Sequence, residues 1–331
     1  MAREPLRIGG YRYEHTEPLF DGRVGIDGVD AVFDASPILS DVFYKMVKGE
    51  YDVAEFGLTY FLRTFDTEDA PFLALPIFPH RNFGQSVVFV NTGSGIEKPE
   101  DLAGRTIGEF ALYGHDPGVW IKGILSDEYG VKPEDCRWVI GGTDYPIKAF
   151  DWIPQPVPDG VDVRHAPDGV TLASMLDSGE IDALISIDVP QAVLHGSARI
   201  ARLFPDYQTV ERDYYLRTGI FPPRHLIAIR RELAGLSGLA AALYRAYSEA
   251  KELVQRAYRD DAPKQHHTVI TPWFSKLFAD NLSLLGEDWW PYGLQRNHSA
   301  VDTFLRYHYE QGLSQRPLSS EDIFVPDLLE S

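Results

Sequence analysis

The sequence predicts an α/β protein with two lobes and a ligand cleft between them. The phrase GEYDVAEF at 49–56 returns as GEIDALIS at 179–186, and each copy joins a helical pattern, a glycine stop and a short apolar strand. Strand and helix patterns alternate between the two copies, which favours mostly parallel sheets covered by helices. The chain has 331 residues, more than one core comfortably supports. Gly-Glu-x-Asp is also a common helix-to-strand phrase, so coincidence is the alternative to two similar lobes.

Residues 1–90 are expected to form the first part of lobe 1. A first strand is predicted over 6–9, and an amphipathic helix follows whose apolar positions run from Ile38 to Val47. Gly49 stops that helix, because glycine adopts the left-handed conformation of a helix end at little cost. The apolar run 51–56 is then a short buried strand.

Lobe 2 is expected over 91–194. Its predicted elements are a strand (86–92), a short helix (98–104), a strand (105–110), a helix closed by Gly130 (117–129), a helix closed by Gly179 (171–178) and a strand (181–187). The Pro- and Gly-rich segment 151–169 interrupts this pattern, and we expect it to be a surface excursion of lobe 2.

The remainder, 195–331, is expected to return to lobe 1 and to end in helices. A strand is predicted within 222–233, a long amphipathic helix over 239–257 and a last helix from about Ser299. In open α/β sheets ligands bind at the carboxyl ends of the strands. Two facing lobes therefore place the functional site in the cleft between them.

Composition and charge narrow the class of partner. With 31 Lys and Arg against 49 Asp and Glu the net charge is −18, which repels phosphate backbones and anionic membrane surfaces. We expect neither nucleic acid nor membrane as a partner, although arginines in a cleft still allow a small anionic ligand. Residues 1–13 have no apolar signal region, and no apolar run reaches about 20 residues, so a cytoplasmic protein is expected. The single cysteine, Cys136, excludes an internal disulfide.

The helix start after strand 105–110 suits an anion. Asp116 is a favourable N-cap residue and Pro117 fits the first helical position, so free N–H groups and the positive end of the helix dipole would face the cleft. Tyr113 and His115 would lie at the mouth of this site. The alternative is a simple capped turn with an exposed histidine.

His80 and Arg81 precede a strongly apolar strand and are flanked by Phe78 and Phe83. Arginine presents a planar fork that holds a carboxylate through two parallel hydrogen bonds, and an apolar rim strengthens them by excluding water. Arg81 is therefore the first candidate for a carboxylate clamp. The alternative is an arginine that pairs with a neighbouring acidic side chain at a lobe boundary.

Polar side chains also gather after the first strand, in the segment GGYRYEHTEPLF at 9–20. Arg12 and the tyrosines beside it suit recognition of a hydroxylated ring. His15 could transfer protons near neutral pH, because the ordinary pKa of histidine lies there. A turn with surface tyrosines would look the same.

Two acidic residues lie at the ends of the repeated strands. Glu55 stands in an apolar context and could exchange a proton if burial raises its pKa. Asp188 occupies the corresponding position in lobe 2, where capping a helix is the simpler role. Near the C-terminus, Arg296 and His298 precede the last helix and could reach the cleft, whereas the neighbouring tryptophans favour a place in the core.

Metal chemistry is the second candidate. The ten histidines form no H-E-x-x-H motif and Cys136 stands alone, so a metal site would have to be assembled from distant residues. The sequence also lacks a P-loop, a G-x-G-x-x-G motif after the first strand and a G-x-S-x-G nucleophile elbow. We therefore expect neither a nucleotide cofactor nor serine hydrolysis.

Several segments together resemble a known family. They are LRIGGYRYEHTEPL, GEYDVAEFGLTYFL, LPIFPHRNFGQSVVFVN, SGIEKPEDLAGRTIG, GEIDALI and WWPYGLQRNHSAVDTFLRYHYEQGL followed by EDIF, and they span nearly the whole chain. Of these segments, SGIEKPEDLAGRTIG and GEIDALI are typical of the wider type 2 periplasmic-binding-protein fold. The beginning and the tail are similar to the 4,5-dihydroxyphthalate decarboxylases, which are built on that fold.

This resemblance implies non-oxidative removal of carbon dioxide from a hydroxylated aromatic diacid, giving protocatechuate. No cofactor is implied, since the aromatic ring itself accepts the electrons, and a divalent metal is the alternative. We then expect Arg81 to hold the carboxylate that stays, assisted by Arg12 or Arg296. His15 or His115 would take the phenolic proton, and Glu55 or another histidine would protonate the ring carbon.

Two other functions stay open at this point. One is a solute-binding protein for a small aromatic or sulfonate ligand, and the other is a decarboxylase of a related aromatic acid. The expected partner in each case is a small anionic aromatic molecule, and an enzyme of this kind is expected to be a homo-oligomer.

Overall fold

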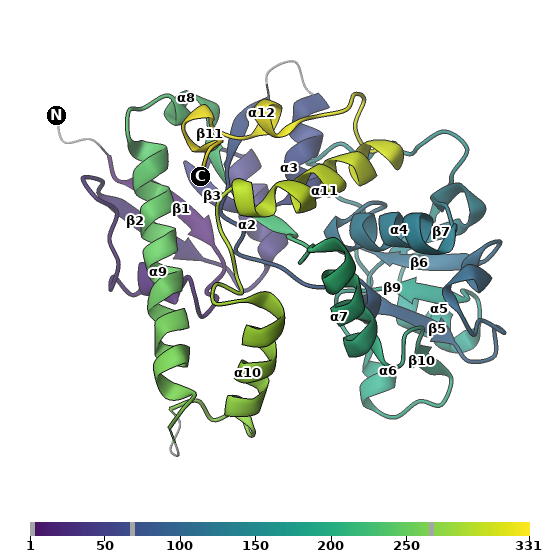
Figure 1. Ribbon diagram of the computed structural model, residues 1–331. Coiled ribbons are helices and arrows are strands. Elements are labelled where there is room, and N and C mark those ends of the chain that lie inside the picture. The colour runs from purple at the N-terminus through teal and green to yellow at the C-terminus, as the bar shows by residue number, and fades with distance from the viewer. Residues whose placement is uncertain (1–3, 67–69, 265–267) are drawn as a thin grey trace.

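The computed structural model describes residues 4–66, 70–264 and 268–331, which form two α/β lobes side by side (Figure 1). Within those ranges no helix combines the length and the apolar character that crossing a membrane requires. Each lobe is built on one mixed sheet, and this confirms the two-lobed α/β fold that the sequence predicts.

Lobe 1 contains a five-stranded sheet in the order β2-β1-β3-β11-β4. The strands are β1 (Leu6–Gly10), β2 (Ala31–Ala35), β3 (Val53–Gly57), β4 (Phe72–Leu75) and β11 (His225–Arg230). β11 runs antiparallel to both β3 and β4, so a strand from the second half of the chain completes the sheet. Helices α1 (Glu17–Phe20), α2 (Leu39–Val47), α3 (Leu58–Arg63), α8 (Arg231–Ala234) and α9 (Leu239–Asp261) belong to this lobe.

Lobe 2 contains a six-stranded sheet in the order β10-β5-β9-β6-β7-β8. The strands are β5 (Val88–Asn91), β6 (Thr106–Phe110), β7 (Arg137–Gly141), β8 (Asp162–His165), β9 (Ala183–Ile185) and β10 (Ile200–Arg202). The helices are α4 (Asp116–Tyr129), α5 (Leu172–Ser178) and α6 (Gln191–Leu194). The strands therefore extend on both sides of the expected range 91–194. β5 runs antiparallel to both of its neighbours, so the sheet is less uniformly parallel than the alternation of patterns suggests.

The repeated phrase marks equivalent places in the two lobes. In each copy a helix ends at a glycine with positive φ, 75° at Gly49 and 82° at Gly179, and a buried strand follows. Only glycine adopts this conformation without strain. The copies then differ, because β3 leads directly into α3 whereas β9 leads into a loop before the short helix α6.

Two segments of the chain connect the lobes, and we call them the crossings: residues 76–87 and residues 203–224. They run antiparallel beside each other, with a β-bridge between Arg81 and Pro223 and a 2.9 Å hydrogen bond from Arg224 N to the His80 carbonyl. α7 (Tyr207–Thr218) lies on the second crossing. The crossings place His80, Arg81 and Arg224 between the lobes.

The sequence suggests that the C-terminal helices return to lobe 1, but not all of them do. α10 (Phe274–Leu285) lies beside α9, but α11 (His298–Glu310) reaches across to α4 of lobe 2 (Figure 1). The Tyr307 hydroxyl and the Arg306 guanidinium both bind Asp127 of α4, and the Tyr307 ring lies edge-on to Trp120. α12 (Ser320–Ile323) follows near lobe 1, where Val325 N binds the Ala74 carbonyl.

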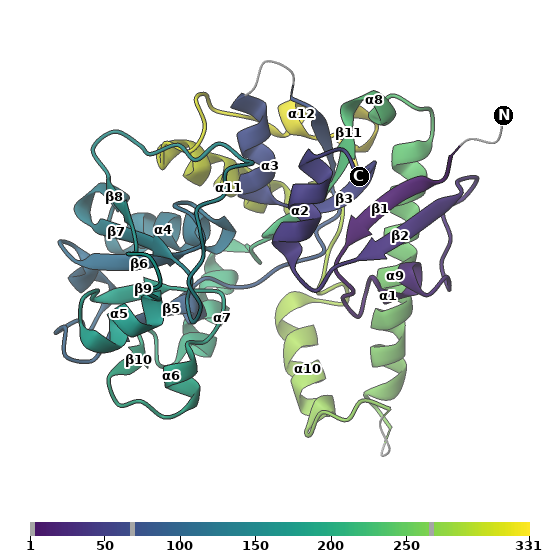
Figure 2. The same ribbon diagram turned by 180° about the vertical axis from the view of Figure 1, so that it is seen from behind.

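The segment between β7 and β8 crosses toward lobe 1 on the other side of the molecule (Figure 2). Trp152 stacks on Tyr60 of α3 at 5.7 Å between ring centroids and lies edge-on to Tyr44 of α2. The predicted excursion 151–169 therefore packs on lobe 1 at one end and contains the edge strand β8. Short 3-10 helices complete the structure at Thr64–Asp66, Gln85–Val87, Pro99–Leu102, Pro133–Asp135, Gln295–Asn297 and Pro326–Leu328.

Candidate active site

A carboxyl group and an imidazole form a buried pair on neighbouring strands of lobe 1. Glu55 on β3 is 1% exposed, and its Oε1 lies 2.6 Å from Nδ1 of His225, the first residue of β11. The same carboxyl group accepts hydrogen bonds from the Tyr13 hydroxyl at 2.7 Å and from the Tyr11 N–H at 3.1 Å. Strand pairing fixes this contact, because His225 is paired with Gly57, two residues beyond Glu55.

Burial moves the pKa values of the pair in opposite directions. It raises the pKa of Glu55 to about 7, although hydrogen bonds from the Tyr13 hydroxyl and the Tyr11 N–H oppose the change. It lowers the pKa of His225 to about 3, with a further contribution from the Arg224 charge. At neutral pH the imidazole is therefore uncharged and the carboxyl group is close to its titration midpoint.

Three more rings surround this pair. His80 lies 4.6 Å from His225 between ring centroids, and Tyr13 stacks on both His80 and His15. His15 also binds the Pro79 carbonyl through Nε2 at 3.0 Å, and burial lowers its pKa to about 4. Burial likewise lowers the pKa of His80, whose Nδ1 has no hydrogen-bond partner among the described residues. Both imidazoles are therefore neutral near pH 7.

Asp116 brings a second carboxyl group to the pair from lobe 2. Its Oδ1 accepts a 2.7 Å hydrogen bond from the Thr59 N–H of lobe 1, and its Oδ2 lies 4.0 Å from His225 Nε2. Burial raises the pKa of Asp116 to about 7. The sequence predicts that Asp116 caps its own helix, but His115 is the N-cap residue. The Asp116 side chain instead binds the start of α3.

A second carboxylate–histidine pair lies in lobe 2. Glu109 on β6 is fully buried, and its carboxylate binds His115 Nδ1 at 3.0 Å, Lys122 Nζ at 2.8 Å and the Gly114 N–H at 2.9 Å. Burial would raise the pKa of Glu109, but Lys122 and His115 outweigh it and lower the pKa. Burial lowers the pKa of Lys122 to about 8, and its ammonium lies 3.6 Å from the Tyr113 ring centroid.

This second pair fixes the tautomer of His115. An ionised carboxylate only accepts hydrogen bonds, so Nδ1 carries the proton and Nε2 carries the lone pair. Nε2 is buried and has no hydrogen-bond partner in the part of the chain that the structure describes. Burial lowers the pKa of His115 against the attraction of Glu109, which keeps the lone pair free at neutral pH.

The positive charge of Arg224 acts on the histidines of both pairs. It is 1% exposed, and NH2 donates to the Phe83 carbonyl at 2.7 Å. Burial lowers its pKa to about 10, opposed by Asp116 and Glu211. After burial itself, the Arg224 charge is one of the causes that lower the pKa values of His80, His115 and His225.

Arg81, the clamp that the sequence predicts, is committed elsewhere. NH1 donates to the Phe221 carbonyl at 2.8 Å, and NH2 donates to the Pro291 carbonyl at 2.6 Å and to the Asn297 side chain. These partners differ from a substrate carboxylate and also from the acidic neighbour that was the alternative. Arg81 fastens the segment before α11 to the crossing between the lobes, next to a cavity of about 170 Å³.

The remaining predicted site residues, apart from Tyr113, lie outside the buried group. Arg12 forms a bidentate ion pair with Glu17 at 2.8 and 2.6 Å, Arg296 pairs with Asp288 at 2.8 Å, and His298 pairs with Asp302 at 2.8 Å. Each of these three side chains is therefore paired with a neighbouring carboxylate at the surface. Tyr113 is buried beneath Lys122, and Asp188 is exposed beyond β9 without capping α6, which begins at Gln191.

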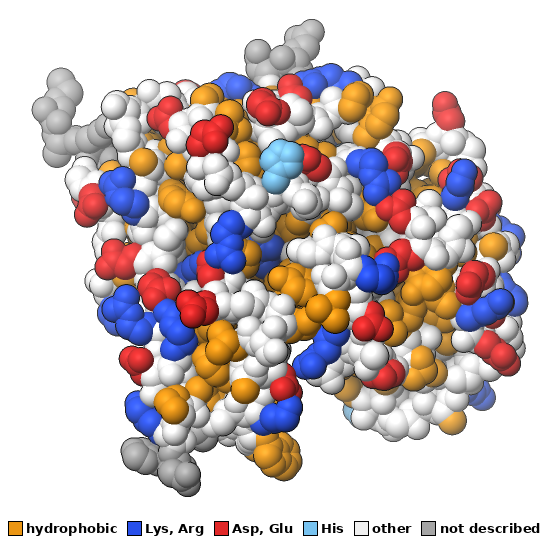
Figure 3. Space-filling model, viewed as in Figure 1, with side chains coloured by type: hydrophobic (Ala, Val, Ile, Leu, Met, Phe, Trp, Pro, Cys, Tyr) orange, Lys and Arg blue, Asp and Glu red, His pale blue; other side chains and the backbone are white. Residues whose placement is uncertain are grey.

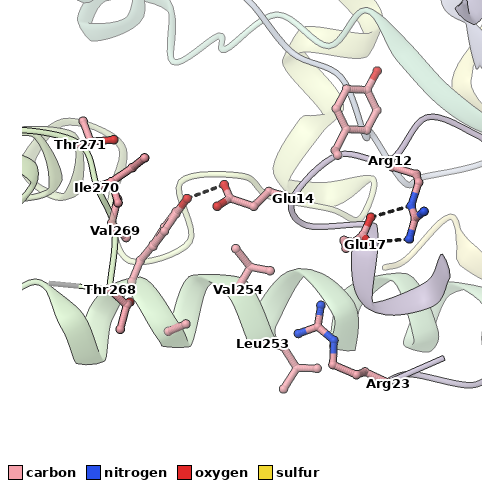
Figure 4. Close-up of a pocket in the computed structure, with 13 residues that line it drawn as sticks. Arg12, Glu14, Glu17, Arg23, Leu253, Val254, Thr268, Val269, Ile270 and Thr271 are labelled. Atoms are coloured by element: carbon pink, nitrogen blue, oxygen red, sulfur yellow. Dashed lines mark hydrogen bonds and ion pairs between the residues drawn. The ribbon is translucent and has the colours of Figure 1, made fainter. Parts of the chain in front are cut away.

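A separate surface groove of about 720 Å³ lies between the segment 12–23 and α9 (Figure 4). Its charged groups are already paired, Arg12 with Glu17 and Glu14 with the Tyr258 hydroxyl. The titratable pairs between the lobes are not part of it. In the space-filling view, a notch separates the α10 end of lobe 1 from lobe 2, and hydrophobic side chains lie above it (Figure 3). No group of three or more described His, Cys, Asp or Glu side chains is arranged to hold a metal ion.

The sequence analysis did not identify four residues of the site, which are His225, Arg224, Glu109 and Lys122. Glu109 and Lys122 each interrupt an apolar run, TIGEF and VWIKGIL. A charged residue in such a run is buried with a partner. The same signal singled out Glu55. Arg224 and His225 stand where a crossing meets an apolar strand, as His80 and Arg81 do.

Fold and site together define a two-lobed α/β protein that has the fold of periplasmic binding proteins and titratable groups buried where its lobes meet. The aliphatic sulphonate binding protein SsuA of Escherichia coli aligns with 98% of this chain over 92% of its own length, at 14% identity and a TM-score of 0.54. The alkanesulfonate-binding protein SsuA from Xanthomonas axonopodis pv. citri, bound to MOPS, matches 98% of the chain and 99% of its own length at 13% identity and a TM-score of 0.53. These likenesses establish the fold alone.

Sequence relatives establish the family. A 4,5-dihydroxyphthalate decarboxylase of Comamonas testosteroni is 34% identical over 338 residues, covering 100% of this chain and 99% of the relative. One of Pseudomonas putida is 33% identical over 228 residues, covering 65% of this chain and 85% of the relative. No protein-family model matches the sequence. The chain belongs to the 4,5-dihydroxyphthalate decarboxylase family, a family of carboxy-lyases.

Proposed function

We propose that the protein removes carbon dioxide from 4,5-dihydroxyphthalate, without a cofactor, and releases protocatechuate. The observation that carries the proposal is the presence of two buried carboxylate–histidine pairs, one from each lobe, with opposite shifts in carboxyl pKa. Groups whose surroundings separate their pKa values in this way suit the roles of acid and base. The names of the two relatives supply the substrate.

The chemistry of the substrate requires one base and one acid. Each carboxylate of 4,5-dihydroxyphthalate is para to a hydroxyl group, so removing the phenolic proton pushes electrons toward the carbon that bears the carboxylate. A proton added to that carbon gives a dienone. Loss of carbon dioxide then returns the bonding electrons to the ring, so one proton is consumed and no electron-accepting cofactor is required.

His115 is the proposed base. Its Nε2 carries a free lone pair, and Glu109 stabilises the imidazolium that forms when the proton arrives. Lys122 keeps Glu109 ionised for this task. The chain Tyr13–Glu55–His225 is the proposed acid, because Glu55 holds a proton up to a pH of about 7 and Tyr13 reaches the less buried side of the group.

His15 and His80 complete the proposed site as neutral rings beside Tyr13, where a hydroxylated aromatic ring could stack. The cytoplasmic location and the homo-oligomeric state expected from the sequence stay predictions, which cell fractionation and light scattering would test.

The test is to incubate the purified protein with 4,5-dihydroxyphthalate, with and without a chelator, and to follow carbon dioxide and protocatechuate. Turnover that the chelator leaves unchanged is the expected result. Turnover that is lost and then restored by a divalent metal would replace the metal-free mechanism. Binding without turnover would favour a solute-binding protein or a different substrate.

A further inference from the structure

The geometry points to Arg224 as the residue that binds the carboxylate retained by the product, assisted by the side chain of Gln85. This inference rests on the proposed function and adds to it the group that recognises an acid rather than a neutral ring.

The first argument is that the Arg224 fork has spare hydrogen-bonding capacity. The guanidinium is 1% exposed, and its one hydrogen bond within the described residues joins NH2 to the Phe83 carbonyl. Nε is buried and has no partner there. A guanidinium offers five N–H donors, and leaving them unmade in a buried place costs free energy. The Nε of Arg81 has no partner within the described residues either, but both of its terminal nitrogens donate to protein acceptors, whereas only NH2 of Arg224 does so.

The second argument is that nearby carboxylates attract Arg224 without occupying it. Asp116 and Glu211 raise its pKa through charge, yet Asp116 binds the Thr59 N–H and Glu211 binds the Ser86 N–H at 2.9 Å. Neither forms a hydrogen bond with the arginine. A planar anion with two oxygens would match the free edge of the fork.

The third argument is a second unpartnered side chain, which lies on the neighbouring crossing, 76–87. Gln85 is fully buried, and neither its amide nitrogen nor its amide oxygen has a hydrogen-bond partner in the described ranges. It stands two residues beyond Phe83, whose carbonyl accepts from Arg224. A buried amide donor and a buried guanidinium on two paired segments together favour an anion over a neutral group.

The position also suits the reaction. The backbone N–H of Arg224 binds the His80 carbonyl, and the Leu58 N–H binds the Arg224 carbonyl, so the arginine is fixed between the crossing and the start of α3. His225 of the acid chain is its neighbour in sequence. A carboxylate held here keeps one end of the ring near the crossing, while the hydroxyl groups at the other end meet the histidines.

The experiment compares two probes that share a catechol ring. Protocatechuate keeps the carboxylate and catechol lacks it, and binding of each to the full chain is measured by isothermal titration calorimetry. We expect the wild-type protein to bind protocatechuate about 10- to 100-fold more tightly than catechol, the range for hydrogen bonds to a charged group. Arg224→Gln should remove most of this preference and leave catechol affinity unchanged.

Two further variants keep the result interpretable. Arg224→Lys retains the charge but not the fork, so it should keep only part of the preference even if Arg224→Gln fails to fold. Arg217→Gln, on the exposed face of α7 where the arginine pairs with Glu128, should keep all of it. An undiminished preference in both Arg224 variants would overturn the inference and leave Arg224 as the structural partner of the Phe83 carbonyl.

Turnover of 4,5-dihydroxyphthalate by the same wild-type preparation separates this inference from the proposed function. Turnover together with an unchanged preference for protocatechuate in the variants would overturn only the role of Arg224 as the carboxylate-binding residue. A preference for protocatechuate that depends on Arg224, in a protein without turnover, would support that role and overturn the proposed reaction.

Discussion

The Asp116 carboxylate of lobe 2 accepts a 2.7 Å hydrogen bond from the Thr59 N–H of lobe 1, at the centre of the buried group. A Cβ atom on Gly57 would lie 2.6 Å from Asp116 Oδ2, so glycine is required for this close approach. The bond joins the starts of two helices, α3 and α4, and lies next to His225. The bond therefore holds the two lobes together beside the proposed acid.

Replacing Glu55 tests the proposed acid. Glu55→Gln keeps the shape of the side chain and removes the exchangeable proton, so kcat should fall on the order of 10²- to 10⁴-fold, the usual contribution of general acid–base catalysis. In the wild-type protein kcat should decline as pH rises through about 7, because Glu55 then loses its proton. Steady-state rates between pH 5 and 9 would check both results. Unchanged turnover in Glu55→Gln would remove this residue from the mechanism.

The same shift makes a prediction about stability. The pKa of Glu55 rises from 4.5 to about 7 on folding, so its contribution to stability is complete below pH 4.5 and is lost as pH rises through about 7. Urea unfolding of the wild-type protein should show this loss between pH 5 and 8, together with a similar one from Asp116. Glu55→Gln should have a flatter profile over that interval. An identical slope in the variant would show that the carboxyl group does not titrate there.

Glu109 and Lys122 allow a test that separates catalysis from support of the fold. Glu109→Gln leaves the buried Lys122 ammonium unpaired, which should cost about 3–5 kcal/mol of unfolding free energy. The double variant Glu109→Gln with Lys122→Met removes both charges and should recover much of that loss. If Glu109 stabilises the His115 imidazolium, kcat should stay low in both proteins. Recovery of kcat along with stability would reduce the pair to a structural role.

Gly118 tests the position of His115 without changing a titratable group. A Cβ atom there would lie 1.9 Å from Glu109 Oε1 and 2.7 Å from His115 Nδ1. Gly118→Ala should therefore displace the pair and lower kcat, although alanine is the better helix former. Gly235→Ala, where a Cβ atom meets nothing within 4 Å, is the matched control and should keep full activity. Equal rates in the two variants would contradict the proposed role of this pair.

Tyr307 tests the contact of α11 with lobe 2. Its ring fills the space above Gly123, where a Cβ atom would lie 2.2 Å from it, and its hydroxyl binds Asp127 at 2.8 Å. Tyr307→Ala should lower the free energy of unfolding by about 3–5 kcal/mol, as for other large aromatic truncations. Tyr307→Phe removes the hydroxyl alone and should cost about 1 kcal/mol. Similar losses in the two variants would mean that ring packing contributes little.

Local patterns predicted much of the fold. The helix, glycine and strand of each repeated phrase depend on residues within a few positions, and both copies lie where the sequence places them. The place of β11 between β3 and β4 could not be read in this way, because its pairing joins residues from 152 positions apart (Ile227 with Leu75) to 176 positions apart (Ile229 with Val53). The reach of α11 to α4 is likewise a tertiary contact that the amphipathic pattern of one helix does not specify.

The candidate site shows the same division. Glu55 was recognisable because an acid inside an apolar strand must find a partner, but its partner His225 lies 170 residues away. Arg81 and Arg224 look alike in sequence, each beside a histidine and an apolar segment. Their contacts in the folded protein differ: the Asn297 side chain and two carbonyl groups accept from the terminal nitrogens of Arg81, whereas the Arg224 guanidinium donates to the Phe83 carbonyl alone within the described residues.

The strands of lobe 1 come from two parts of the chain, one before and one after the strands of lobe 2. This arrangement sets the order in which the two sheets can form during synthesis. All strands of lobe 2 lie between Val88 and Arg202, so that sheet can form while the remaining 129 residues are still being translated. The lobe 1 sheet must wait for β11, which supplies its missing strand between β3 and β4. The α4 surface around Trp120 stays uncovered until α11 emerges, so a nascent chain exposes apolar surface there nearly to its end.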